Sequence, residues 1–246
     1  MKHLAFDDID STNSEAWRQH AAGERGPLWI TAKRQSAGRG RSGRNWASTD
    51  GNLFASLLLQ LDIAPTIAAG LSLVTGVALE AAIRGLAPQQ LEENLRLKWP
   101  NDVLLDGKKL AGILIESAAE NPMTIVIGAG VNLVSHPEDI GRPATDLRSY
   151  GVAATPEILL PLFAAEMAKA LAAFDSGVGF EQIRTRWLNR AMRTGTDLSV
   201  NTGTELLSGV FAGLDLDGAL LLAATDGSLR RVTFGDVSIN QRPQPA

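Results

Sequence analysis

The stretch LRLKWPNDVLLDGKKLAGILIE, residues 95–116, places two apolar runs on either side of Asp106-Gly107. An Asp-Gly pair between apolar runs is typical of a tight β-hairpin, because the turn needs residues that tolerate positive φ. Pro100-Asn101-Asp102 interrupts the first run, so a short strand is expected before it and another after it. The predicted hairpin would bring Asn101 and Lys109 to one pocket.

Lys109 lies inside the second apolar run. Burying an ammonium group is costly unless it is paired, so Lys109 is expected to meet an anion. The alternative is that its aliphatic stem lies along apolar surface while the ammonium group stays in water.

Apolar segments on both sides of the hairpin extend it to a mixed or antiparallel sheet backed by helices. Strands are predicted at residues 28–33, 51–61 and 123–133, and helices at residues 66–86, 155–174 and 180–192. After Arg193 the pattern changes to five short strands joined by turns, which is typical of a small barrel of about 50 residues. We therefore expect an α+β fold with two domains, residues 1–193 and 194–246.

Residues 33–44, KRQSAGRGRSGR, hold five cationic side chains and no carboxylate in a chain whose net charge is −4. Three glycines within the stretch allow main-chain N–H groups to approach a small ligand while the arginines neutralise it. The sequence therefore predicts a loop that closes on a small phosphorylated or carboxylated molecule.

Three other interpretations of this basic stretch are possible. Gly38, Gly40 and Gly43 have the spacing of a dinucleotide-binding motif, but that motif opens a helix, whereas this stretch continues through Trp46 into a strand. Nucleic-acid binding is disfavoured because one basic loop in an acidic chain attracts phosphate weakly. A solvated surface loop without a function stays open as the third interpretation.

Ser11-Thr12-Asn13 is a second candidate binding segment. Thr12 and Glu15 have the spacing of a capping box at a helix start, and the helix would end at Gly23. The three polar side chains would also offer donors and acceptors to a polar, uncharged head group. The two roles are compatible.

Composition excludes several classes of site. The chain has no cysteine, so disulfides and thiolate chemistry are impossible. Its histidines, His3, His20 and His136, are too far apart in sequence to suggest a metal cluster. The N-terminus lacks the apolar core of a secretory leader, and we expect a soluble, cytoplasmic protein.

Five motifs follow one another along the chain: Ser11-Thr12-Asn13, Gly38-Arg39-Gly40-Arg41-x-Gly43-Arg44-x-Trp46, Lys98-Trp99-Pro100-Asn101-Asp102, Lys109-Leu110-Ala111-Gly112-Ile113-Leu114-x-Glu116 and Gly128-x-Gly130-x-Asn132. Together they resemble the biotin protein ligases over nearly the whole chain. The resemblance implies that residues 1–193 form a catalytic biotin- and ATP-binding domain related to class II aminoacyl-tRNA synthetases, and that residues 194–246 form an SH3-like β-barrel.

The resemblance also implies a reaction in two steps. Biotin and MgATP first give biotinoyl-5′-AMP and pyrophosphate. A lysine of the biotin carboxyl carrier protein of acetyl-CoA carboxylase, or of a similar biotin-dependent enzyme, then takes the biotinoyl group. ATP and biotin are thus substrates, and Mg²⁺ is held largely by phosphates, with no protein ligand assigned.

The family's site residues match positions in this chain. By resemblance, the biotin site comprises Ser11, Thr12, Asn13, Gln35, Arg39, Gly40, Arg41, Lys109 and Gly112. The nucleotide side comprises Trp46, stacked on adenine, with Asn101, Asp102 and Asn132. Lys109, Arg39 and Arg41 are the implied catalytic residues, and Lys109 would contact the biotin carboxylate and the α-phosphate.

Two departures from the family pattern bear on function. Ser42 stands where the family loop often has a further arginine, which is expected to alter retention of the adenylate. Some bacterial relatives carry an N-terminal helix-turn-helix, whereas here Ser11 lies near the first residue. We therefore expect a carrier domain as partner, no DNA and no membrane, and leave a homodimer open.

Two rival functions stay open at this point. A lipoate or octanoyl ligase on the same scaffold would need a more apolar pocket than Ser11-Thr12-Asn13 offers. A nucleic-acid-binding module would use the basic loop and the small barrel without catalysis.

Overall fold

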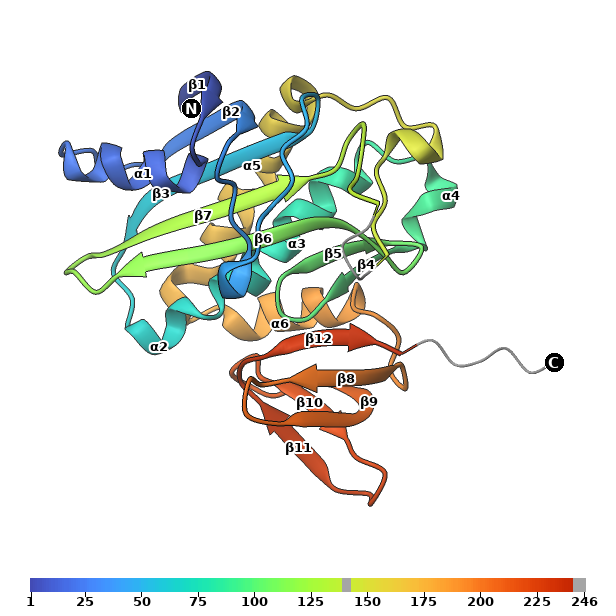
Figure 1. Cartoon of the computed structure of the whole chain (residues 1–246). Helices are drawn as coiled ribbons and strands as arrows, with labels where there is room; N and C mark the ends of the chain where they lie inside the picture. The colour runs from blue at the N-terminus through green and yellow to red at the C-terminus, as the bar shows by residue number, and fades with distance from the viewer. Residues whose placement is uncertain (139–142, 241–246) are drawn as a thin grey trace.

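The computed structural model describes residues 1–138 and 143–240, which form a larger α+β unit and a smaller β unit (Figure 1). A seven-stranded sheet in the order β1-β2-β3-β7-β6-β5-β4 forms the larger unit. β1 and β2 pair in parallel, and the other neighbours pair antiparallel. The predicted mixed sheet is thus confirmed. Its strands are β1 (Lys2–Ile9), β2 (Leu28–Gln35), β3 (Leu53–Leu61), β4 (Leu95–Lys98), β5 (Asp102–Leu105), β6 (Lys108–Ala118) and β7 (Met123–Val131).

The predicted hairpin joins β5 to β6. Asp106 and Gly107 have φ values of 51° and 72°, the positive values that such a turn needs. The pairing places Asp102 opposite Gly112. The turn therefore fixes which residues of the two strands share a face.

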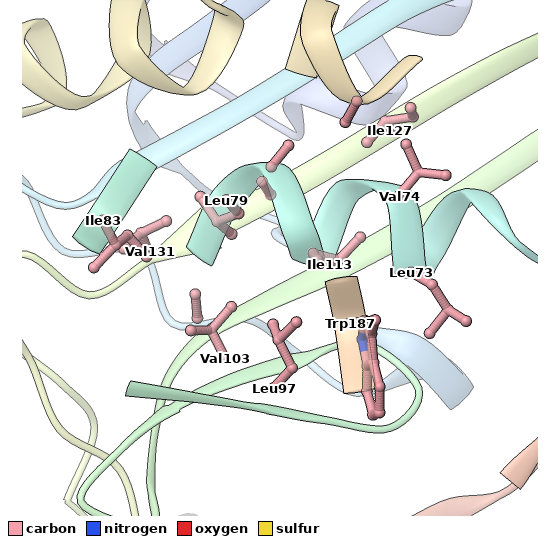
Figure 2. Packing of buried hydrophobic residues seen from close by; sticks show 14 of the residues in the cluster. Leu73, Val74, Leu79, Ile83, Leu97, Val103, Ile113, Ile127, Val131 and Trp187 are labelled. Atoms are coloured by element: carbon pink, nitrogen blue, oxygen red, sulfur yellow. The ribbon is translucent and has the colours of Figure 1, made fainter. Parts of the chain in front are cut away.

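Helices cover one face of this sheet. Figure 2 shows Leu73, Val74, Leu79 and Ile83 of α3 (Leu71–Arg84) packed over buried side chains of the strands. α5 (Pro156–Phe174) and α6 (Phe180–Asn189) complete this layer, and two short helices, α2 (Pro65–Ala68) and α4 (Gln89–Glu92), flank it. Since side chains alternate along a strand, the residues between these apolar positions face the opposite side of the sheet.

The helix predicted at residues 66–86 is divided into α2 and α3. Gly70 lies at the break, where the ring of Phe180 would come within 2.9 Å of a side-chain Cβ. A side chain at position 70 would therefore contact the ring of Phe180 unless that ring moved.

α1 (Thr12–Ala21) covers part of the opposite face, where Ala16 packs among Leu28, Leu58 and other buried apolar residues. Ser11 is the N-cap, and its hydroxyl accepts a hydrogen bond from the N–H of Ser14. The predicted capping box at Thr12 is therefore wrong by one residue. α1 leaves the rest of this face uncovered.

The smaller unit is an antiparallel sheet in the order β11-β10-β9-β8-β12, consistent with the SH3-like barrel expected at the C-terminus. Its strands are β8 (Asp197–Asn201), β9 (Leu206–Leu214), β10 (Leu220–Ala223), β11 (Leu229–Val232) and β12 (Asp236–Ile239). β12 lies on the side nearest the larger unit (Figure 1). The Trp99 indole N–H donates to the carbonyl of Gly218 at 3.0 Å, which ties the two units together.

Candidate active site

A cavity of about 950 Å³ lies over the sheet face that α1 leaves uncovered. Its floor includes Gly112, Gly128 and Gly130, and Gly112 and Gly130 are register partners on β6 and β7. A Cβ on Gly130 would come within 2.4 Å of the Trp46 ring, and one on Gly128 within 2.4 Å of Asn13 Oδ1. The glycines therefore let side chains of other segments lie directly on the strands.

Every site residue singled out in the sequence lines this cavity: Ser11, Thr12, Asn13, Gln35, Arg39, Gly40, Arg41, Trp46, Asn101, Asp102, Lys109, Gly112 and Asn132. They come from the start of α1 with its N-cap Ser11, the strands β2, β5 and β6, the loop after β2, the turn between β4 and β5, and the residue after β7. The fold thus brings five separated motifs to one surface.

One end of the cavity is polar and uncharged. The Gln35 side-chain oxygen accepts from the Thr12 N–H at 2.8 Å and from the Thr12 hydroxyl at 3.1 Å. The Ser56 hydroxyl, which is fully buried, lies 2.8 Å from Thr12 Oγ1 and 2.6 Å from Asn13 Oδ1. This network holds the polar groups at the start of α1 in fixed orientations.

Glu116 joins α1 to the basic loop. Its carboxylate accepts from Asn13 Nδ2 at 3.1 Å, from Trp17 Nε1 at 3.0 Å and from Arg39 Nη2 at 3.0 Å. One carboxylate of β6 therefore contacts both Asn13, which Ser56 also holds, and Arg39.

The basic stretch is divided by the fold. Lys33 and Arg34, at the end of β2, pair with Asp7 and Asp8 of β1 at 2.8 and 2.6 Å, and neither lines the cavity. The anion-binding loop predicted from residues 33–44 therefore excludes these two cations. The sheet register determines this, because it places β2 beside the acidic edge strand β1.

The loop after β2 folds back on itself above the cavity and crosses β7 and β6 in Figure 1. Arg39 and Asn45 form an isolated antiparallel bridge, and the Gly40 N–H donates to the carbonyl of Arg44 at 2.7 Å. A single 3₁₀ turn, Arg41–Gly43, forms the tip, where Ser42 has a φ of 55°. Arg39, Arg41 and Arg44 of this loop all line the cavity.

Trp46 ends the loop and lies over Gly112 and Gly130. Its indole N–H is buried and has no hydrogen-bond partner among the described residues. The Lys109 ammonium lies 5.4 Å from the centre of the ring, a cation–π distance. The aromatic ring is thus part of the cavity floor.

Lys109 is buried and forms an ion pair with Asp102, whose other oxygen lies 2.9 Å from Lys98 Nζ. Burial alone would raise the pKa of Asp102, but the two ammonium groups outweigh it and hold the pKa below the usual 3.8. Lys109 therefore meets an anion, as predicted, and the alternative of a lysine in water is wrong. This anion is a carboxylate of the protein itself, in addition to the biotin carboxylate and α-phosphate that the resemblance implies.

The two asparagines on the predicted nucleotide side are anchored to the backbone. Asn101 Nδ2 donates to the carbonyl of Ile113 at 2.6 Å, while its Oδ1 accepts from Arg41 at 3.3 Å. Asn132 Nδ2 donates to the carbonyl of Thr145 at 3.0 Å. Both side chains are therefore held at the cavity wall.

Several residues of the cavity and its support were missed by sequence reasoning. The hydroxyl of Ser56 lies within a fully apolar run, and an unexplained polar group there was an available signal. Lys98 and Glu116 belong to the motifs identified in the sequence, but no role was predicted for either residue. Residues 236–239 of β12 also line the cavity, and no local pattern indicated that contact.

The charges of the cavity favour an anion. Its lining carries three carboxylates, Asp102, Asp106 and Asp236, against six cations: Arg39, Arg41, Arg44, Lys98, Lys108 and Lys109. Among residues 1–138 and 143–240 no group of three His, Cys, Asp or Glu side chains could hold a metal ion. The cavity therefore suits a ligand with a neutral polar head and a strongly anionic tail.

Family models match both units: the biotin/lipoate A/B protein ligase family over residues 5–132, and the biotin protein ligase C-terminal domain over residues 199–239. The biotin–[acetyl-CoA-carboxylase] ligase of Paracoccus denitrificans is 41% identical over 227 residues, which cover 89% of this chain and 92% of that protein. The bifunctional ligase/repressor BirA of Escherichia coli is 32% identical, with 94% of this chain and 72% of that protein covered.

A solved structure gives the same result in three dimensions. The biotin protein ligase of Aquifex aeolicus in complex with biotin and ATP matches 98% of this chain and 99% of its own, at a TM-score of 0.81 and 25% identity. The similarity therefore extends over both units of the chain. The chain belongs to the biotin protein ligase family.

Proposed function

We propose that this enzyme activates biotin with ATP as biotinoyl-5′-AMP and transfers the biotinoyl group to a lysine of the biotin carboxyl carrier protein of acetyl-CoA carboxylase or a similar enzyme. One observation carries the proposal: a single cavity joins a polar, uncharged end at Thr12, Asn13 and Gln35 to a cation-rich end at Lys109. The carrier is proposed from the name of the Paracoccus relative, an acetyl-CoA-carboxylase ligase.

In this proposal the ureido ring of biotin occupies the polar end. A ureido group has N–H donors and a carbonyl acceptor, so it needs partners of both kinds in fixed positions. Ser11, Thr12, Asn13 and Gln35 offer hydroxyl and amide groups there. Because Ser56 and Glu116 hold these side chains, little ordering remains for the ligand to impose.

The biotin carboxylate would then extend toward Lys109, Arg39 and Arg41. One carboxylate oxygen attacks the α-phosphorus of ATP, the bond to the β-phosphate oxygen breaks, and pyrophosphate leaves. No general base is needed, because the carboxylate is already ionised at neutral pH. The cations bring two anions together and stabilise the charge that develops in the transition state.

In the second step the amine of the carrier lysine attacks the acyl carbon of the adenylate. The bond from that carbon to the phosphate oxygen breaks, AMP leaves, and the amine nitrogen loses a proton to form the amide. The loop 38–46 would cover the adenylate until the carrier arrives. Covering the mixed anhydride keeps water from hydrolysing it.

Mg²⁺ would enter on the phosphates of ATP. Asp102 is engaged by two lysines and Asp236 by Arg44, so these carboxylates do not form a dedicated cage. Mg²⁺ commonly keeps several waters and binds substrate phosphates. Arg41, Lys98 and Lys109 would then share neutralisation of the phosphates with the ion.

The proposal is tested by incubating the protein with ATP, Mg²⁺, biotin and a purified carrier domain, with modification of the carrier lysine read by mass spectrometry. We expect one biotinoyl group on the carrier, dependent on ATP. Parallel reactions with lipoate and octanoate distinguish the rival ligases. Modification by lipoate or octanoate in place of biotin would overturn the proposal.

Gly128→Ala should weaken biotin binding by about 5-fold to 150-fold, since overpacking of this kind costs about 1–3 kcal/mol. The new Cβ would lie 2.4 Å from Asn13 Oδ1 and would displace that side chain. Calorimetric titration with biotin measures the effect. In an Asn13→Ala background the same substitution should add little further loss, because its clash partner is gone. A full additional loss would show that Gly128→Ala does not act through Asn13.

Trp46→Ala should weaken ATP binding much more than biotin binding. Stacking of a base on an aromatic ring contributes roughly 1–3 kcal/mol, so ATP affinity should fall by about 5-fold to 150-fold. Separate titrations with each ligand test this. Equal losses for both would mean that Trp46 only fills the floor over Gly112 and Gly130.

A further inference from the structure

Two hydrogen bonds connect the basic loop, near the N-terminus, to residues of the smaller unit near the C-terminus. Arg44 Nη2 donates to Asp236 Oδ1 at 2.5 Å, and Arg41 Nη2 donates to the carbonyl of Gly235 at 3.4 Å. Both acceptors belong to the corner that leads into β12. No motif analysis assigned a part to Asp236.

The corner at residues 235–237 is held against the larger unit independently of the loop. Lys98 Nζ donates to the carbonyl of Val237 at 2.9 Å, and Asp236 is the register partner of Asn201 on β8. The Trp99 contact to Gly218 fixes the same interface. The corner is therefore a stationary point to which a loop can attach.

Arg44 contacts both the tip of the loop and Asp236, so it can hold the tip in place. Its Nε donates to the carbonyl of Arg41 at 3.2 Å, and its own carbonyl accepts from the Gly40 N–H. One guanidinium thus contacts the tip of the loop and the smaller unit together. Arg41, from the same tip, reaches Asn101 at the cavity wall.

We propose that Asp236 is a positioning residue that, through Arg44, holds the loop 38–46 closed over the cavity and so retains the adenylate. The inference rests on the proposed function for its effect on the adenylate. Asp236 need not touch the reacting atoms, because it acts through the orientation of the loop.

The ion pair between Arg44 and Asp236, here called the latch, is exposed enough to open and close reversibly. The side chains of Arg44 and Asp236 are 43% and 38% exposed, and ion pairs of this exposure are weak. A weak pair shifts the ratio of closed to open loop without preventing the opening that substrates and the carrier require. Loss of such a pair should raise the open fraction by about two- to fivefold.

The experiment compares wild-type protein with Asp236→Asn, and Asp236→Glu serves as the conservative variant. Adenylate loss is measured as AMP released without carrier, in the presence of biotin, ATP and pyrophosphatase. Loop opening is measured separately as the rate of trypsin cleavage after Arg41 and Arg44 in the protein without ligands. Both rates should rise about two- to fivefold in Asp236→Asn, and Asp236→Glu should stay close to wild type.

Asp215→Asn is the matched control, because it removes another exposed ion pair of the smaller unit, with Arg231 at 2.7 Å. It should change neither rate. Raising the ionic strength should bring wild type closer to Asp236→Asn, since salt screens the exposed pair.

The outcomes separate this inference from the proposed function. Wild-type activity with biotin, combined with unchanged AMP release and unchanged cleavage in Asp236→Asn, would overturn the latch and leave the proposed function intact. Absence of any biotin-dependent reaction in wild type would overturn the proposed function, and the cleavage rates would still decide whether Asp236 holds the loop.

Discussion

Lys109→Ala should reduce the rate of adenylate formation by about 100-fold or more while the protein remains folded. Removal of one preorganised charge that stabilises a transition state costs on the order of 3 kcal/mol. Lys109 meets this description because it is buried at the cation-rich end of the cavity, beside the Trp46 ring. The measurement is the rate of biotin-dependent exchange between ATP and labelled pyrophosphate.

The fold should survive this substitution because Asp102 keeps a second partner. Lys98 Nζ lies 2.9 Å from the Asp102 carboxylate, so the buried charge stays paired when Lys109 is removed. Lys169→Ala is the control, since it also removes an ion-paired lysine, with Glu166 at 2.7 Å on the outer face of α5. A normal exchange rate in Lys109→Ala would show that another cation stabilises the transition state.

Asp102→Asn should lower the free energy of unfolding by about 3–5 kcal/mol, the range for removing one partner of a buried ion pair. The variant keeps the shape of the side chain but leaves the ammonium groups of Lys98 and Lys109 close together without their anion. Urea denaturation measures the change. Asp215→Asn, in an exposed pair, should change stability by less than about 1 kcal/mol.

The pH dependence of this difference follows from the lowered pKa of Asp102. The carboxyl binds its proton more weakly in the folded protein than in the unfolded chain, where the ordinary value is 3.8. The contribution of the ionised Asp102 carboxylate to the free energy of unfolding is therefore complete above pH 3.8. It is lost as the pH falls through the lower pKa of the folded state. Wild type and Asp102→Asn should converge in stability only in strong acid. A difference that disappears near neutral pH would contradict the assignment.

The order of elements could be predicted from local sequence because turns and apolar periodicity are local. Asp106-Gly107 predicted the β5–β6 hairpin, and the apolar runs predicted β3 and β7. β1 was missed because it is an edge strand with mostly exposed side chains, so its alternating apolar pattern is limited to Leu4 and Phe6. Helix ends also shifted where another element packs closely, as at Gly70.

The cavity residues could be found by their motifs, but their interactions could not. The division of the basic stretch depends on β1 lying beside β2, which pairs Lys33 and Arg34 with carboxylates away from the cavity. The contact between Arg44 and Asp236 joins residues far apart in the chain, and only the packing of the two units creates it. Long-range pairs of this kind leave no signal in a local sequence pattern.

Biotin-dependent exchange of labelled pyrophosphate into ATP is the most direct test of the central claim, because it reports adenylate formation without requiring a carrier. The account predicts exchange that needs both biotin and Mg²⁺, is unaffected by Lys169→Ala and falls by about 100-fold or more in Lys109→Ala. Exchange that proceeds equally well without biotin, or none at all in the folded wild-type protein, would contradict it.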